Sequence, residues 1–197
     1  MNKCSVIMFA GILICLAVPA LATAPDRDYF TANEDPQAYS DLEVNDEHHT
    51  NLVLDWIRDA RFDRALADIN YVLDRWPNHP RALLLLETVA RLTHAPNLPL
   101  FHYEKALKLY PQYALTHAQF GHYLVEIGKI DQGIHSLKRA AQIDSQLRVV
   151  HVWLAEAYDK YGDKVLARKE AEQARNLGFQ GEFSPDLGQS SNGTKPK

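Results

Sequence analysis

Two consecutive stretches of the sequence decide the fold: residues 114–147, ALTHAQFGHYLVEIGKIDQGIHSLKRAAQIDSQL, and residues 148–181, RVVHVWLAEAYDKYGDKVLARKEAEQARNLGFQG. Aligned without a gap, they place small residues in the same columns, 34 residues apart: Gly121 and Ala155, Gly133 and Ala167, Ala140 and Ala174. Small residues let two helices approach closely, whereas large side chains hold the axes apart. Each stretch therefore predicts two helices joined by a turn, with Gly128 and Gly162 at the turns because glycine tolerates positive φ.

The same period extends toward the N-terminus. Pro77 and Pro111 end the similar phrases VLDRWP and ALKLYP, and they are also 34 residues apart. This spacing defines two further units, 46–79 and 80–113, so that four units follow one another in phase.

The unit 80–113 is irregular. Glu87 and Pro99 occupy columns that hold small residues in the two C-terminal units. A proline fits the first turn of a helix, where its missing N–H would have no partner. We therefore predict that the second helix of this unit begins near Leu98 and is short.

Four such units resemble the tetratricopeptide repeat (TPR) family, whose unit is a 34-residue helix–turn–helix. The family has small residues at positions 8, 20 and 27 of the unit, as the columns above do, and a proline at position 32. The resemblance implies an all-α fold, a right-handed α–α superhelix (solenoid) of four units over residues 46–181. Each unit buries its apolar face against its neighbours, so stability grows by stacking.

Residues 1–22 have the pattern of a signal peptide. Lys3 precedes an uncharged apolar run of 13 residues, and Ala20-Leu21-Ala22 fits the small-x-small cleavage pattern. An uncleaved anchor is the alternative, but a membrane span needs about 20 apolar residues. Both cysteines lie in this segment, so the remaining chain has no disulfide or cysteine ligand. We expect an exported protein, most simply periplasmic, that does not span a membrane after cleavage.

Two flanks complete the predicted organisation. Residues 23–45 are acidic, with six carboxylates against Arg27. Chain ends are usually loose, which favours a solvated lead-in. The alternative is an arm that docks on the repeats through three aromatic residues: Tyr29, Phe30 and Tyr39. The polar tail 182–197 is predicted to be disordered.

Composition and motifs narrow the function. The chain has 21 Lys and Arg against 25 Asp and Glu, so the formal net charge of −4 argues against a nucleic-acid partner. It lacks a nucleophile elbow, a phosphate-binding loop and a paired-histidine zinc motif. We therefore expect no enzyme and no cofactor. His48-His49 beside Asp46 and Glu47 is a weak candidate metal cluster, because adjacent residues diverge on a helix.

The resemblance also implies a binding groove. In the family, positions 2, 5, 6, 9, 12 and 13 of the first helices line the concave face, where a partner polypeptide binds. Carried over to this sequence, ten residues form the predicted partner-binding groove: Arg58, Arg81, Leu84, Leu85, Arg91, Gln119, His122, Glu126, Trp153 and Glu156. The groove has an apolar floor, arginines at one end and acidic residues at the other. We predict a client segment with an apolar stretch and an acidic flank that the arginines select.

Two alternatives stay open. After the last unit, Phe179, Phe183 and Leu187 offer only partial cover, so an uncovered end could pair with a second copy as a homodimer. The histidines could instead serve a metal or small-ligand carrier. Trp153 itself has two interpretations, since it either anchors a partner or packs against a neighbouring helix.

Overall fold

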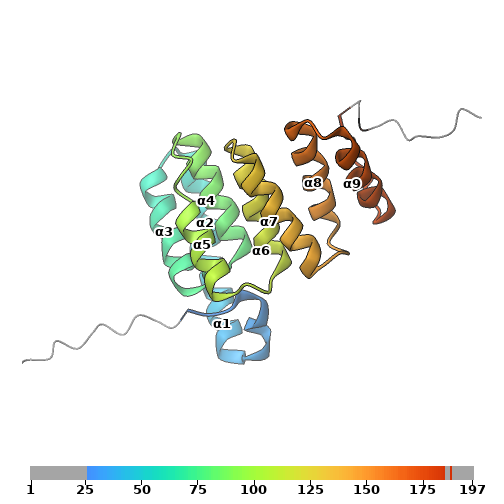
Figure 1. Cartoon of the computed structure of the whole chain (residues 1–197). Helices are drawn as coiled ribbons and strands as arrows, with labels where there is room; N and C mark the ends of the chain where they lie inside the picture. The colour runs from blue at the N-terminus through green and yellow to red at the C-terminus, as the bar shows by residue number, and fades with distance from the viewer. Residues whose placement is uncertain (1–25, 185–186, 188–197) are drawn as a thin grey trace, which may run out of the picture.

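A computed structural model describes residues 26–184 and Leu187, and the predicted signal peptide lies outside them. The regular elements of this part are helices, which stack side by side in a row (Figure 1). Their bounds are η1 (Tyr29–Glu34), α1 (Pro36–Asn45), η2 (Asp46–Thr50), α2 (Asn51–Arg58), α3 (Phe62–Arg75), α4 (Pro80–Leu92), α5 (Leu100–Leu109), α6 (Ala114–Glu126), α7 (Ile130–Ile143), α8 (Arg148–Tyr161) and α9 (Lys164–Asn176).

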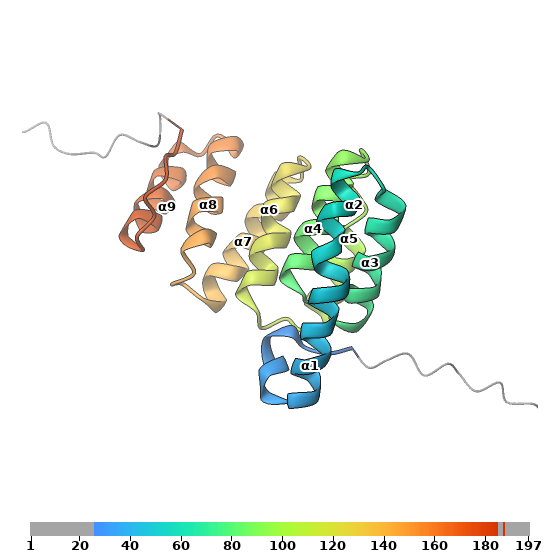
Figure 2. The same cartoon turned by 180° about the vertical axis from the view of Figure 1, so that it is seen from behind.

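Each predicted range contains two of these helices, the first being η2 with α2, α4, α6 or α8. The first helices of neighbouring ranges contact one another, as α2–α4, α4–α6 and α6–α8. Each second helix contacts the first helix that follows it, as in α3–α4 and α7–α8. The first helices thus form a continuous inner layer, which runs the length of the row (Figure 2).

The turns between paired helices have one backbone geometry. Gly128 and Gly162 have φ values of 84° and 95°, which confirms the prediction that glycine supplies positive φ there. Ala60 and His94 occupy the same column of the first two units and have φ values of 56° and 54°. The turn therefore requires a left-handed residue even where a side chain makes it costly.

Helix spacing within a pair follows the small-residue columns. A Cβ atom built on Gly121 would lie 2.8 Å from the carbonyl oxygen of Gly133, so α6 and α7 meet backbone to backbone. In the irregular unit, α4 and α5 lack such an approach. There Glu87 and Tyr103 are buried between the helices, and α5 begins at Leu100 with ten residues. The prediction of a short helix that begins near Leu98 is confirmed to within two residues.

Histidines at position 4 of the units support the packing. His151 is buried between Glu170, 2.7 Å away, and the carbonyl oxygen of Ser145, 3.1 Å away. His49 has the same relationship to Asp68, at 2.8 Å. These histidines are half-buried or buried structural residues.

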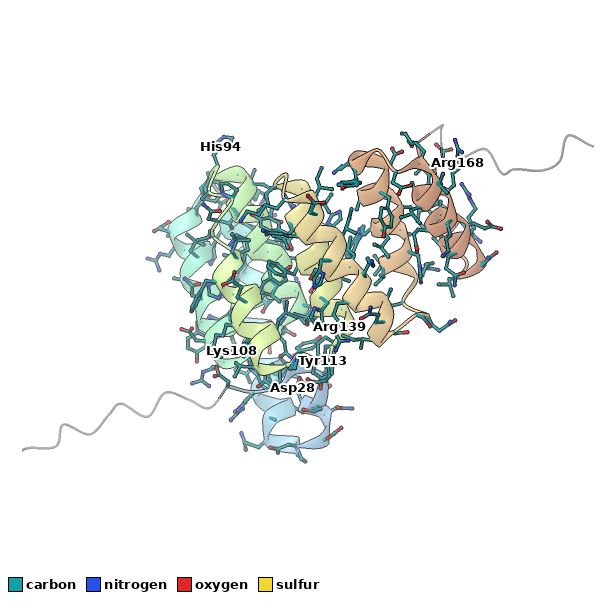
Figure 3. All side chains as sticks on the ribbon, in the orientation of Figure 1. Asp28, His94, Lys108, Tyr113, Arg139 and Arg168 are labelled. Carbon is teal, nitrogen blue, oxygen red and sulfur yellow. The ribbon has the colours of Figure 1, made fainter. Side chains whose placement is uncertain are left out.

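The acidic N-terminal segment folds onto the repeats, so the prediction of a solvated lead-in is wrong for residues 26–45. Asp28 accepts hydrogen bonds from Asn78 Nδ2 at 2.7 Å and from the Tyr113 hydroxyl at 2.5 Å. Figure 3 shows Asp28 and Tyr113 meeting where this segment adjoins the helix row. The Phe30 ring stacks on Tyr113 with centroids 4.3 Å apart. Aromatic burial and satisfied carboxylates offset the entropy of ordering the segment.

This arm covers an edge of the solenoid, not its groove. Several of its partners lie in the loops between units, with Asn78 and His79 before α4 and Tyr113 before α6. Asp26 also pairs with Lys105 on α5 at 2.8 Å. His79 also contacts Asp46 at 3.0 Å. Tyr39, the third predicted aromatic contact, is instead exposed.

The C-terminal end is covered more fully than the sequence suggested. Phe183 is half-buried and Leu187 is buried in the C-terminal hydrophobic core. The Ser184 hydroxyl donates to Asp159 at 3.2 Å. The predicted tail boundary at residue 182 is therefore wrong, because Phe183 and Leu187 pack against the C-terminal core. Residues 185–186 and 188–197 lie outside the described part.

Candidate protein-binding groove

Position 6 of the units lies at the contacts between neighbouring inner helices. Arg81 donates to Asn51 Oδ1 at 2.6 Å across α2 and α4. Gln119 donates to the carbonyl oxygen of Pro80 at 3.1 Å across α6 and α4. Trp153 stacks on His122 with ring centroids 4.5 Å apart across α8 and α6. Each of these contacts fixes one inner helix against the next.

This packing corrects two of the predicted groove residues. Leu85 is only 7% exposed and belongs to the N-terminal core, and Gln119 is only 3% exposed. Both occupy position 6, where the adjacent inner helix covers the side chain. The prediction that Leu85 and Gln119 form an accessible surface is therefore wrong.

The N-terminal half of the groove exposes leucines. Leu54 and Leu84 are 50% and 42% exposed. Each follows a residue of the Asn51–Arg81 contact by one helical turn, so the two leucines lie on adjacent parts of α2 and α4. Arg58 adjoins this patch and pairs with Asp55. The patch is an apolar part of the groove that solvent reaches.

Arg91 occupies the middle of the groove. Its guanidinium lies 2.6 Å from Glu126 on α6 and 3.7 Å from Glu87 on its own helix. Arg58, Arg81 and Arg91 thus all have partners within the chain. To select an acidic flank of a client, these arginines would have to give up their partners within the chain and pair with carboxylates of the client.

Glu87 is the most unusual ionisable group behind the groove. It is 2% exposed, and the Tyr103 hydroxyl donates to it at 2.5 Å. Burial raises the pKa of Glu87 to about 7, although Tyr103 and Arg91 oppose the shift. Glu87 stands at position 8 of its unit, where the two C-terminal units have a small residue. Its larger side chain lies between α4 and α5, which are therefore farther apart than the helices of those units.

The C-terminal half of the groove is aromatic and acidic. Burial lowers the pKa of His122, which stacks on the half-buried Trp153 ring. Burial also raises the pKa of Glu156, and the neighbouring Glu126 adds to this shift while Lys160 opposes it. Trp153 therefore packs against a neighbouring helix and still borders the groove.

Two cavities adjoin Glu126. A cavity of about 440 Å³ lies between α4 and α6, and the residues that line it are Ala90, Arg91, His94, Pro96, Tyr123, Glu126 and Ile127. A cavity of about 330 Å³ lies between α6 and α8, and the residues that line it are His122, Glu126, Glu156, Asp159, Lys160, Glu182, Phe183, Ser184 and Leu187. His94, labelled in Figure 3, marks the end of α4 at which the first cavity opens.

Sequence reasoning missed several of these lining residues. Tyr123 and His94 lie outside the family groove positions, although Pro96 and Pro99 marked the altered turn beside them. Phe183 and Leu187 were seen only as end cover, yet they also form a wall of the second cavity.

Metal and membrane features are limited in the described part of the chain. Residues 26–184 and Leu187 contain no group of three or more His, Cys, Asp or Glu side chains placed to hold a metal ion. Within the same residues, no helix is long and apolar enough to cross a bilayer.

Comparisons with known proteins bear on the fold. No protein-family model matches the sequence, and neither does any curated protein. Similar solved structures include Pseudomonas aeruginosa PilF, with a TM-score of 0.56 and 19% identity over 69% of this chain and 62% of that one. A TPR protein of Thermus thermophilus, TTC0263, has a TM-score of 0.53 and 21% identity over 68% of this chain and 74% of that chain.

A third similar structure is that of the APC/C hetero-tetramer Cut9–Hcn1, with a TM-score of 0.54 and 18% identity. The match covers 71% of this chain and 28% of that one. At these identities the likeness concerns the fold alone. It confirms the predicted all-α solenoid: the chain has the tetratricopeptide repeat fold.

Proposed function

We propose that this protein is a non-enzymatic interaction module, an exported adaptor, scaffold or assembly factor that binds a client polypeptide in its concave groove. The exposure of Leu54 and Leu84 on the inner layer carries the proposal. A solenoid buries apolar side chains by stacking, so leucines left open on a concave surface are suited to a partner. The Cut9–Hcn1 neighbour, a hetero-tetramer, agrees with a partner-binding use of the fold.

The location is part of the same proposal. The charged start, apolar run and cleavage pattern of residues 1–22 support export, and a periplasm is the simplest destination. In that setting the groove would hold an exported polypeptide. Export itself is tested by sequencing the N-terminus of the protein recovered from the periplasm, where a start at Thr23 is expected.

The groove is tested by site-specific photo-crosslinking in cells. A photoreactive residue at Leu84 should form a reproducible adduct with another polypeptide, and Leu54→Glu should abolish that adduct. Val165 on α9 is the matched control, since it is 75% exposed but lies on a second helix. Equal adducts from both positions, or adducts from neither, would contradict the proposal.

A further inference from the structure

We infer that the client segment carries two anchors, an aromatic or branched apolar side chain for the α4–α6 cavity and a lysine or arginine for the α6–α8 cavity. This inference rests on the proposed function and specifies the chemistry of the client. It differs from the sequence-based hypothesis, in which arginines of the groove select an acidic flank.

The first anchor follows from the shape and lining of the α4–α6 cavity. Pro96, Tyr123 and Ile127 supply apolar walls, and the volume of about 440 Å³ exceeds that of any single side chain. The Tyr123 hydroxyl already donates to the Pro96 carbonyl oxygen at 2.9 Å, so this pair makes no demand on a ligand. An apolar or aromatic side chain is the occupant that such walls favour, because it removes apolar surface from water.

The second unit, which departs from the repeat pattern, forms part of the cavity wall. Glu87 and Pro99 replace small residues, and α5 consequently begins late, after the loop that contains Pro96. In the third unit, by contrast, α6 and α7 cross closely at Gly121 and Gly133. The irregular unit therefore contributes His94 and Pro96, which follow α4, to the lining of the α4–α6 cavity.

The second anchor follows from the charges around the α6–α8 cavity. Among the described residues, its carboxylates are Glu126, Glu156, Asp159 and Glu182, and Lys160 supplies the ammonium group. Arg91 engages Glu126, and Lys164 lies 2.5 Å from Asp159. Neither Glu156 nor Glu182 has a hydrogen bond or a salt bridge within the described residues.

Aromatic and apolar groups complete this second cavity. His122 lines it and stacks on Trp153, and Phe183 and Leu187 line it as well. A long basic side chain buries its methylene stem against such groups while its charged head meets carboxylates. Burial is the main cause of the raised pKa of Glu156, and the charge of Glu126 adds to it. An incoming cation would offset this repulsion between the two carboxylates.

The arrangement of the two cavities sets the spacing of the anchors. Both contain Glu126, so the Arg91–Glu126 contact forms a ridge between them. Neighbouring packed helices are about 8–10 Å apart. An extended chain advances about 3.3 Å per residue, so the two anchors should be roughly three residues apart in the client.

The test is selection of peptides from a random library displayed on phage, with the whole purified protein as the target. Enriched peptides should pair an aromatic or branched apolar residue with Lys or Arg two to four positions away. Synthetic copies should bind Glu156→Gln about tenfold more weakly, as expected for the loss of one charged contact. Glu172→Gln, an exposed carboxylate on α9, is the matched control and should leave affinity unchanged.

A second readout locates the apolar anchor. A benzophenone amino acid in place of that residue in the peptide should cross-link to Tyr123 or Ile127, as identified by mass spectrometry. Two outcomes would overturn the two-anchor inference and leave the groove proposal standing. In the first, the enriched peptides need Leu84 for binding but contain no basic residue. In the second, they bind Glu156→Gln as tightly as they bind the parent protein. Failure to enrich any peptide would overturn both.

Discussion

The Tyr113 hydroxyl donates a hydrogen bond to Asp28 Oδ2 at 2.5 Å, across 85 residues of sequence. Asp28 also accepts from the Asn78 side chain and from the backbone N–H of Phe30. One carboxylate thus joins the N-terminal arm to two loops between units. Because three donors depend on it, Asp28 is the residue whose loss should most loosen the arm.

We predict that Asp28→Ala lowers the free energy of unfolding by about 2–3 kcal/mol, since charged hydrogen bonds are lost and the Asn78 donor loses a partner. Hydrogen exchange should accelerate most in residues 29–45. Glu34→Ala, an exposed change in the same arm, is the control and should have little effect. Unchanged exchange in the arm of Asp28→Ala would show that its other contacts, such as the Phe30–Tyr113 stack and the Asp26–Lys105 pair, are enough to hold it.

Glu87 should make stability depend on pH. Its pKa in the folded protein is about 7, above the ordinary value of 4.5, so the folded state retains a proton that the unfolded state releases. Stability is therefore highest below pH 4.5 as far as this group is concerned, and it falls as the pH rises from about 4.5 to 7. A shift of this size corresponds to roughly 3 kcal/mol over the whole window.

Glu87→Gln tests this dependence, because the amide still accepts from Tyr103 but does not ionise. The variant should lose most of the fall in stability between pH 5 and pH 8, measured as urea midpoints at each pH. At pH 8 it should be more stable than the parent protein. If the urea midpoints of both proteins change in parallel with pH, ionisation of Glu87 is not the cause of the fall in stability over this pH range.

The turn residues of the units offer a third test of stability. Ala60 adopts a φ of 56°, a conformation that costs a residue with a side chain about 1–2 kcal/mol. Ala60→Gly should therefore stabilise the protein by up to about 1 kcal/mol, after the larger entropy of glycine in the unfolded chain is subtracted. Gly162→Ala, where a Cβ would meet no atom within 4 Å, should destabilise it by a similar amount. Thermal or urea unfolding measures both variants. If both substitutions raise, or both lower, the free energy of unfolding, the left-handed backbone at these turns is not what determines their effect.

The close crossing of α6 and α7 should tolerate no added methyl group. In Gly121→Ala the new Cβ would lie 2.8 Å from the Gly133 carbonyl oxygen and 2.9 Å from the Leu137 nitrogen, both backbone atoms. We expect a loss of about 1–3 kcal/mol in the free energy of unfolding, the usual cost of overpacking. In Gly128→Ala no atom would lie within 4 Å of the added Cβ, so any loss in that variant measures the cost of positive φ and not of a clash. A Gly121→Ala variant as stable as the parent protein would show that the crossing has room to relax.

The groove could be predicted only in part. Leu84, Trp153 and Glu156 were placed on the concave side by their position in the repeat, and the structure puts them along the inner layer. Leu85 and Gln119 had equally good positions but are buried. The exposure of a side chain at position 6 depends on how closely the adjacent inner helix approaches. The residues of a single helix do not determine that distance.

The helix pairs were determined by the sequence itself, because their signals are local: small residues every 34 positions, glycines at the turns, and Pro99 at the delayed start of α5. What tertiary structure alone decided is long-range. It brought Asp28 to Tyr113, set Phe183 beside His122 around one cavity, and opened the space between α4 and α6. Such contacts join residues far apart in the chain, so their energies depend on the curvature of the whole stack and leave no periodic trace in the sequence.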